Sequence, residues 1–156
     1  MTAKTAYDLA RPAALRWAKD SQLLSLSGTW DSARNYLDGE GDWSLLFYSP
    51  SQSSIALVSV AEGSATVIDT HGVTQQPPVQ TIELWRLDSP EVVNLLKSNG
   101  GNEFLRGQPQ AGLALSLNLV GNTAWSARLI NQETRRIFDV RLEADDGELI
   151  KILQSG

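Results

Sequence analysis

The sequence predicts an α+β protein built from two similar units, each a helix packed on an antiparallel β-meander of three to four strands. Three observations predict this class. A helical pattern precedes a run of strand patterns in the first half, and the same order returns in the second. Short turns separate the strands, as in a meander. Trp43 and Trp125 also stand at equivalent places, each 12 residues before an isoleucine (Ile55 and Ile137).

The first unit is expected to begin with a helix over Thr5–Asp20, with Thr5 as its N-cap, because alanines recur there at helical spacing. Pro12 predicts that this helix either kinks or truly begins near Arg11, since proline removes a backbone donor. A polar connection is expected over Asp31–Asp42. Four strands are expected, over Leu23–Ser27, Trp43–Tyr48, Ile55–Val60 and Ala65–Asp69.

The second unit is expected to begin with a capped helix, in which Ser89 is the N-cap and Pro90 the first helical residue. The run 99–101 (Asn-Gly-Gly) should end or interrupt that helix. Leucines then alternate with small or polar residues from Leu113 to Leu119, which is the period of a strand buried on one face. Further strands are expected over Trp125–Ile130, Arg136–Glu143 and Glu148–Leu153.

These patterns divide the chain into a first unit over 1–76, a linker or bridging strand over 77–88 and a second unit over 89–156. The pair Pro77-Pro78 marks the linker, because proline resists both helix and central strand. We expect a duplication whose halves can share one core, which would bury more apolar area than either half alone. The alternative is one continuous domain whose strands happen to share a spacing.

Composition excludes several classes of function. A net charge of -5 disfavours nucleic acids and anionic membranes, since Arg135–Arg136 is the densest cationic spot. The absence of cysteine excludes disulfides, thiolate zinc sites and cysteine nucleophiles. No run of 18 apolar residues is present, so we expect a soluble chain with no membrane insertion. The first ten residues lack the pattern of a secretion signal. The oligomeric state is not indicated.

The candidate chemical sites are weak. His71 follows Asp69, but no serine stands in a nucleophile pattern, so we interpret it as a loop histidine. Asp38, Glu40 and Asp42 alternate as at the start of a calcium loop, yet position six is tryptophan and position twelve is serine. We interpret that segment as an acidic loop. The sequence therefore predicts no catalytic residue, no metal site and no cofactor.

Five tryptophans are unusual in a chain of 156 residues. Trp17, Trp43 and Trp125 have positions typical of a core. Trp30 borders a polar loop and Trp85 lies between charged residues, so these two are the candidates for a binding surface, where indoles give large contact area. Ordinary packing is the alternative for both.

The segment from Arg136 to Ile150, which contains Ala144-Asp145-Asp146-Gly147-Glu148, resembles the closing hairpin of PepSY-type domains. The helix and Trp-led strand before it match the order of that family, whereas Asp146 stands where threonine is usual and Ser64 stands at the glutamate position of the first half. The resemblance covers 89–153 well and 5–70 loosely. It implies a tandem pair of cystatin-like helix-plus-sheet units that are non-catalytic, usually extracytoplasmic and, in some relatives, propeptides or peptidase inhibitors.

We therefore expect a non-enzymatic interaction or regulatory module that binds a protein or peptide, for example along a sheet edge. It should act outside the cytoplasm if the chain derives from a longer exported or membrane-anchored protein, and in the cytoplasm otherwise. The alternative is a small-ligand carrier with a pocket between helix and sheet. An enzyme that uses scattered carboxylates is the third and weakest hypothesis.

Overall fold

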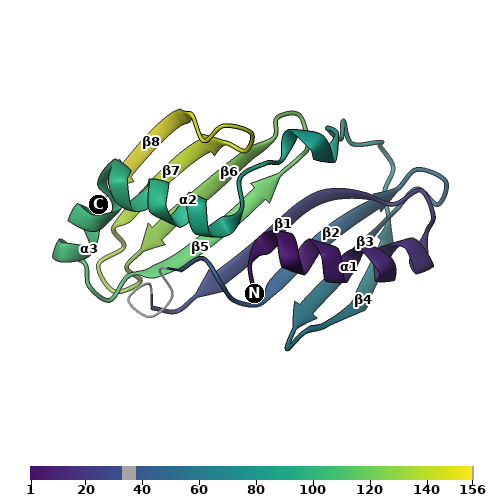
Figure 1. The fold of residues 1–156 in the computed structure, drawn as a ribbon, viewed down its shortest axis with the longest axis horizontal. Coiled ribbons are helices and arrows are strands. Elements are labelled where there is room, and N and C mark those ends of the chain that lie inside the picture. Colours follow the sequence, from purple (N-terminus) through teal and green to yellow (C-terminus); the bar gives the residue numbers. More distant parts are fainter. Residues whose placement is uncertain (33–37, 156) are drawn as a thin grey trace.

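The computed structural model describes residues 1–32 and 38–155 and confirms the α+β class (Figure 1). Within these residues the strands form one antiparallel sheet of eight strands, in the order β4-β3-β2-β1-β5-β6-β7-β8. The strands are β1 (Gln22–Trp30), β2 (Trp43–Ser49), β3 (Ser54–Ala61), β4 (Ser64–Gly72), β5 (Gly112–Asn118), β6 (Ala124–Ile130), β7 (Ile137–Glu143) and β8 (Leu149–Ser155). The helical segments are α1 (Ala3–Trp17), the 3-10 turn η2 (Ile82–Leu84), α2 (Ser89–Leu96), the π-helical turn η3 (Lys97–Gly101) and α3 (Asn102–Gly107).

The helices lie on one face of the sheet, which we call the inner face (Figure 1). α1 packs on β2, β3 and β4, and α2 packs on β6. Along β5 the leucines Leu113, Leu115 and Leu117 are buried, while Ser116 and Asn118 are exposed on the outer face. The alternation predicted for this strand is therefore confirmed, because successive strand residues point to opposite faces.

α1 differs from its prediction at both ends. Its N-cap is Thr2, whose side chain accepts a hydrogen bond from the Thr5 amide, so the assignment of Thr5 as N-cap was wrong. The helix begins at Ala3, ends at Trp17 and continues through Pro12. The proline costs one backbone hydrogen bond. The flanking alanines are fully or almost fully buried against the sheet, and this packing keeps the segment helical across it.

The N-termini of α1 and α2 meet. Asp88, and not Ser89, is the N-cap of α2: its Oδ1 accepts from the Ser89 amide at 2.7 Å and from the Lys4 amide at 3.0 Å. The buried Ser89 hydroxyl accepts from the Ala3 amide at 3.0 Å and donates to the Gly39 carbonyl at 2.6 Å. One pair of adjacent side chains therefore satisfies free amides at the start of both helices.

The run 99–101 interrupts the helix of the second half instead of ending it. Gly100 has φ = 113°, a conformation open to glycine, and α3 continues directly after this π-helical turn. The sequence analysis did not predict α3. In the second half of the chain, α2 and α3 thus take the place of the single continuous helix of the first half.

The segment 77–88, expected as a linker or bridging strand, forms no strand of the sheet. It makes an isolated bridge between Val79 and Val120 and then turns through η2. The amides of Arg86 and Leu87 both donate to the Ala144 carbonyl, at 3.0 and 2.8 Å. The segment thus crosses from the first half to the second and places Trp85 between them. Of the predicted polar connection over Asp31–Asp42, residues 33–37 lie outside the described residues.

The strand register explains the spacing shared by the two halves. Trp43 pairs with Val60 across β2 and β3, and Trp125 pairs with Leu142 across β6 and β7. Both partners lie 17 residues after their tryptophan. β1 also runs past its predicted end, because a side chain at Gly28 would come within 3.1 Å of both the Trp30 and Trp43 rings, and glycine leaves room for them.

A row of aromatic rings crosses the inner face where the halves meet. The ring centroids are 5.6 Å apart for Trp30–Trp43, 6.5 Å for Trp43–Trp125 and 6.3 Å for Trp125–Trp85, all edge-to-face. Tyr7 of α1 continues the row at 5.8 Å from Trp85. Each indole contact of this kind adds to the burial of a large apolar surface.

In the residues that the structure describes, none of the helices combines the length and the apolar character needed to cross a membrane.

The shared cap gives a first prediction. Asp88→Ala should lower the free energy of unfolding by about 1–3 kcal/mol, because the amides of Ser89 and Lys4 lose their acceptor. Urea unfolding followed by tryptophan fluorescence measures this loss. Asp8→Ala, an exposed substitution in α1, is the matched control and should change the free energy by less than about 0.5 kcal/mol. Equal effects of the two variants would contradict the role of Asp88.

A second prediction concerns pH. The Ser49 hydroxyl and the Ser51 amide both donate to the Asp20 carboxylate at 2.7 Å, and these bonds lower the pKa of Asp20 below its ordinary value of 3.8. A lowered pKa stabilises the fold above the ordinary value, and this stabilisation is lost as the pH falls through the folded-state pKa. The difference in unfolding free energy between wild type and Asp20→Asn should therefore be largest near neutral pH.

Urea titrations at pH 7 and at pH 3 test this expectation, and the difference between the two proteins should shrink at pH 3. Lys19→Gln, one residue away, is the control, since lysine keeps its charge over this range. A difference for Asp20→Asn that is the same at both pH values would show that the carboxylate bonds do not stabilise the fold.

Candidate functional site

Trp30 and Trp85, the candidates for a binding surface, are only 7% and 5% exposed. The Trp30 indole N–H donates to the Glu40 carbonyl at 3.0 Å, and that of Trp85 donates to the Leu87 carbonyl at 2.7 Å. Trp30 also borders a depression of about 490 Å³ beside Leu113. Most of each indole belongs to the aromatic row, and a binding role for the two residues stays a prediction.

The other residues weighed from sequence form no chemical site with His71. His71 is exposed, as expected, but it lies on β4, where it pairs with Ile55, and not in a loop. Asp38 accepts a hydrogen bond from the Glu40 amide at 3.0 Å, which is the bond of a local turn. In the described part of the chain, His, Cys, Asp and Glu side chains form no group of three or more that could hold a metal ion.

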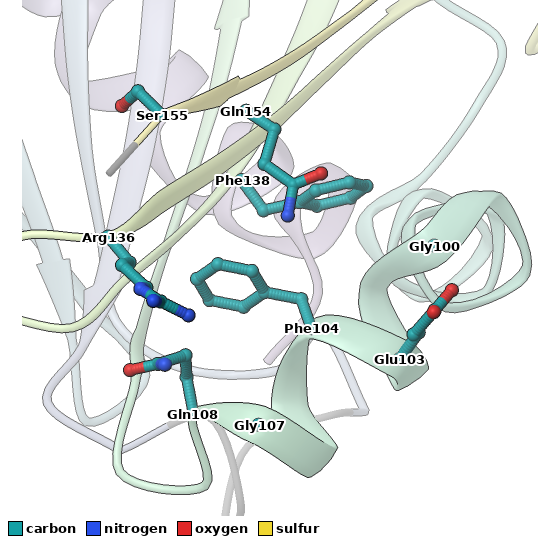
Figure 2. Close-up of a pocket in the computed structure, with 9 residues that line it drawn as sticks. All are labelled: Gly100, Glu103, Phe104, Gly107, Gln108, Arg136, Phe138, Gln154 and Ser155. Carbon is teal, nitrogen blue, oxygen red and sulfur yellow. The ribbon is translucent and has the colours of Figure 1, made fainter.

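A cavity of about 410 Å³ lies between α3 and the strands β7 and β8 (Figure 2). Phe104 of α3 and Phe138 of β7 form its floor, with ring centroids 5.8 Å apart and planes tilted by 32°. Gly100 closes one side, and a side chain there would come within 2.8 Å of the Phe138 ring. The π-helical turn therefore sets how close the helix approaches Phe138.

Polar side chains surround this floor. Figure 2 shows Arg136 and Gln108 on one side of the Phe104 ring, Glu103 on the other and Gln154 above Phe138. Arg136 directly precedes β7, Glu103 belongs to α3, Gln108 follows the end of α3 and Gln154 belongs to the edge strand β8. The cavity thus combines two aromatic rings with one cation, one anion and two amides.

Gln108 is the buried polar residue of this group, only 8% exposed. Its Oε1 accepts from Asn131 Nδ2 at 2.7 Å and from Thr134 Oγ1 at 2.9 Å. Two donors on the oxygen fix the orientation of the amide, so Nε2 remains as a donor on the side of the cavity. The Asn131 Oδ1 in turn accepts from the amides of Glu133 and Thr134, which orders the loop before Arg136.

The edge strand β8 adjoins the cavity. All seven of its residues are exposed, and Gln154 and Ser155 line the cavity at its end. Four large apolar side chains of β8 are 40–49% exposed: Leu149, Ile150, Ile152 and Leu153. Since β8 is the last strand in the sheet order, one of its edges faces no other strand of the described chain. Such an edge is a template for pairing with another segment.

Sequence reasoning missed this site. Phe104 lies beyond the glycines that were expected to end or interrupt the helix, and Gln108 carries no pattern of its own. Arg136 was noted as part of the densest cationic spot, but only to argue against nucleic acids and anionic membranes as partners. The contact between residues 104 and 138 joins segments that no local period connects.

Comparisons with known proteins bear on the fold alone. The chain matches no known family model, and no curated protein sequence resembles it significantly. Among solved structures, a putative lipoprotein from Clostridium difficile 630 is similar, with a TM-score of 0.53 over 96% of this chain and 93% of that protein. The two sequences are 11% identical over the match. At this identity the similarity shows a shared α+β fold.

The bond between Asn131 and Gln108 yields a third prediction. Asn131→Ala should lower the free energy of unfolding by about 1–3 kcal/mol, because the buried Gln108 amide loses a donor and the loop loses its organising acceptor. Thermal and urea unfolding measure the loss. Gln132→Ala, the exposed neighbour, is the control and should stay within about 0.5 kcal/mol of wild type. A neutral Asn131→Ala variant would contradict this account of the loop.

Proposed function

We propose that the protein is a non-enzymatic interaction module that binds an extended peptide along β8. The observation that carries the proposal is the open edge of this strand, together with its exposed apolar side chains. A peptide that adds to such an edge gains backbone hydrogen bonds, while alternate side chains provide selectivity.

The two edges of the sheet support this choice of strand. On β4 the one large apolar side chain that is strongly exposed among the described residues is Ile68, which stands at a register shift opposite Leu57 and Val58. Such irregularities blunt an edge. β8 has a register shift only near its start, between Arg141 and Leu142, and its following residues pair regularly with β7.

Charge next to the edge favours an acidic partner. Arg141 of β7 and Lys151 of β8 are direct cross-strand partners, so two cations lie side by side on the outer face. A peptide whose acidic residue falls beside Lys151 would relieve their repulsion. We propose that such a residue contributes to selectivity.

We also propose that the chain contains PepSY-like units. The segment 136–150, which resembles the closing hairpin of that family, spans β7, its turn and the first two residues of β8, so the proposed peptide site adjoins this hairpin. The pairing of Ser27 with Ser116 at the centre of β1 and β5, flanked by matching strand orders, supports a tandem pair of units. The description of the similar solved structure as a lipoprotein supports a site of action outside the cytoplasm.

A second candidate function is a small-ligand carrier, and the cavity between α3 and β7 favours it. About 410 Å³ is in the range of pockets that hold small molecules.

The fourth prediction tests the peptide site. Peptides selected from a random display library should bind with dissociation constants in the micromolar range and should slow hydrogen exchange of the β8 amides. Leu153→Ser should weaken the best selected peptide by about tenfold or more, because it removes an apolar contact from the outer face and leaves the charge there unchanged.

Ile68→Ser places the same kind of change on the opposite edge and is the matched control, which should leave peptide binding unchanged. Circular dichroism and thermal unfolding of both variants establish that each one is folded. If no peptide is enriched, or if Ile68→Ser weakens binding as much as Leu153→Ser, the proposal is wrong.

A further inference from the structure

We infer that the cavity between α3 and β7 binds a small organic carboxylate with a compact apolar body. This inference rests on the second candidate function, a small-ligand carrier, and does not depend on peptide binding at β8. It names the chemical class of the ligand from the donors and the aromatic surface that line the cavity.

The donors point to an anion. Arg136 contributes a guanidinium, which matches the geometry of a carboxylate with two parallel N–H bonds. Gln108 contributes an amide donor, since its oxygen is already occupied by Asn131 and Thr134. A carboxylate has two oxygens that can accept from both groups, whereas an amine or an alcohol would leave this pair of donors without a charged acceptor.

The aromatic floor suits a compact apolar body. Phe104 and Phe138 are 7% and 4% exposed, so their remaining accessible surface is small. Figure 2 shows the Phe104 ring between Arg136 and Glu103, with Gln154 above the Phe138 ring. A single ring or a short branched chain can cover this surface, while a long acyl chain would extend beyond the cavity into water. Aromatic contacts of this type prefer offset or edge-to-face arrangements.

The site is preorganised. Gln108 is the C-cap of α3, and its backbone N–H donates to the Phe104 carbonyl at 2.8 Å. The backbone N–H of Asn131 donates to the Arg136 carbonyl at 3.0 Å, which fixes the backbone at Arg136. The helix end and the loop that supply the two donors are therefore joined to each other before any ligand arrives. The Gln108 amide and the backbone of Arg136 are held in place and so lose less conformational freedom on binding, while the Arg136 side chain itself is exposed.

The charge of Glu103 distinguishes an anionic ligand from a cationic one. Its carboxylate stands on the rim opposite Arg136, where it would repel an anionic ligand weakly through solvent (Figure 2). Removal of this charge should leave the affinity for a carboxylate unchanged or slightly improved. A ligand that carries a cation would respond in the opposite direction.

The experiment compares three probes that share one ring: phenylacetate, phenylacetamide and phenethylamine. Each is titrated into the full chain and followed by amide chemical shifts in NMR spectra. Phenylacetate should shift the resonances of residues 104, 108 and 138 and bind at least about tenfold more tightly than the other two probes. Arg136→Gln should weaken phenylacetate binding by roughly tenfold.

Two variants serve as controls. Arg141→Gln removes a cation from β7, the strand that follows Arg136, but on the outer face, and should not change phenylacetate binding. Glu103→Gln should leave it unchanged or tighten it by about two- to fivefold. Neither control substitution fills the cavity. Thermal unfolding establishes that Arg136→Gln, Arg141→Gln and Glu103→Gln are all folded.

Several results would overturn the inference. Equal binding of the three probes, or an equal loss of affinity in Arg136→Gln and Arg141→Gln, would show that Arg136 does not bind the carboxylate. Phenethylamine binding that is lost in Glu103→Gln would retain a small-ligand carrier but assign it a cationic ligand. The absence of shifts for all three probes would count against the site itself, while the peptide experiment at β8 would be unaffected.

Discussion

The pairing of β1 with β5 is the contact on which the rest of the fold depends. It joins the two halves into one sheet, and Ser27 and Ser116 face each other at its centre. Directly beside it the rings of Trp43 and Trp125 meet at 6.5 Å on the inner face. Separated halves would each expose a sheet edge and one side of a buried tryptophan, both of which are costly in water.

The helices also join the two halves, on the side of the core opposite the sheet. The shared cap at Asp88 and Ser89 connects the starts of α1 and α2, and the crossing segment 77–88 inserts Trp85 between Tyr7 and Trp125. The indole N–H groups of Trp85 and Trp125 donate to the same Leu87 carbonyl, at 2.7 and 2.9 Å. Polar groups that the aromatic row would otherwise bury without partners are thereby satisfied.

The candidate sites arise where the two halves differ. α1 is continuous and packs across β2, β3 and β4, so it covers the inner side of the first edge. In the second half the helix turns at Gly100, and α3 stops over Phe138. The cavity lies beside α3, between this short helix and the strands β7 and β8. The open edge of β8 has a separate cause, because this strand is the last in the sheet order.

Periodicity determined most of the secondary structure. Alternating leucines predicted β5, because a side-chain period of two leaves only one face for the core. The shared spacing after Trp43 and Trp125 predicted equivalent places in the two halves, and the structure pairs both tryptophans with the residue 17 positions later. The helix caps were harder. Thr5 and Ser89 are good N-cap residues, yet the caps are Thr2, which accepts from the Thr5 amide, and Asp88, which accepts from the Ser89 amide.

What the sequence by itself determined is the class of fold, the order of its elements and the positions of most strands, because these follow from local hydrophobic period and turn chemistry. Tertiary structure alone decided that the halves share one sheet, that Trp30 and Trp85 lie mainly in the core, and that Arg136, Gln108 and Phe104 line one cavity. Each of these depends on contacts between segments far apart in the chain, and no pattern within a single segment encodes them.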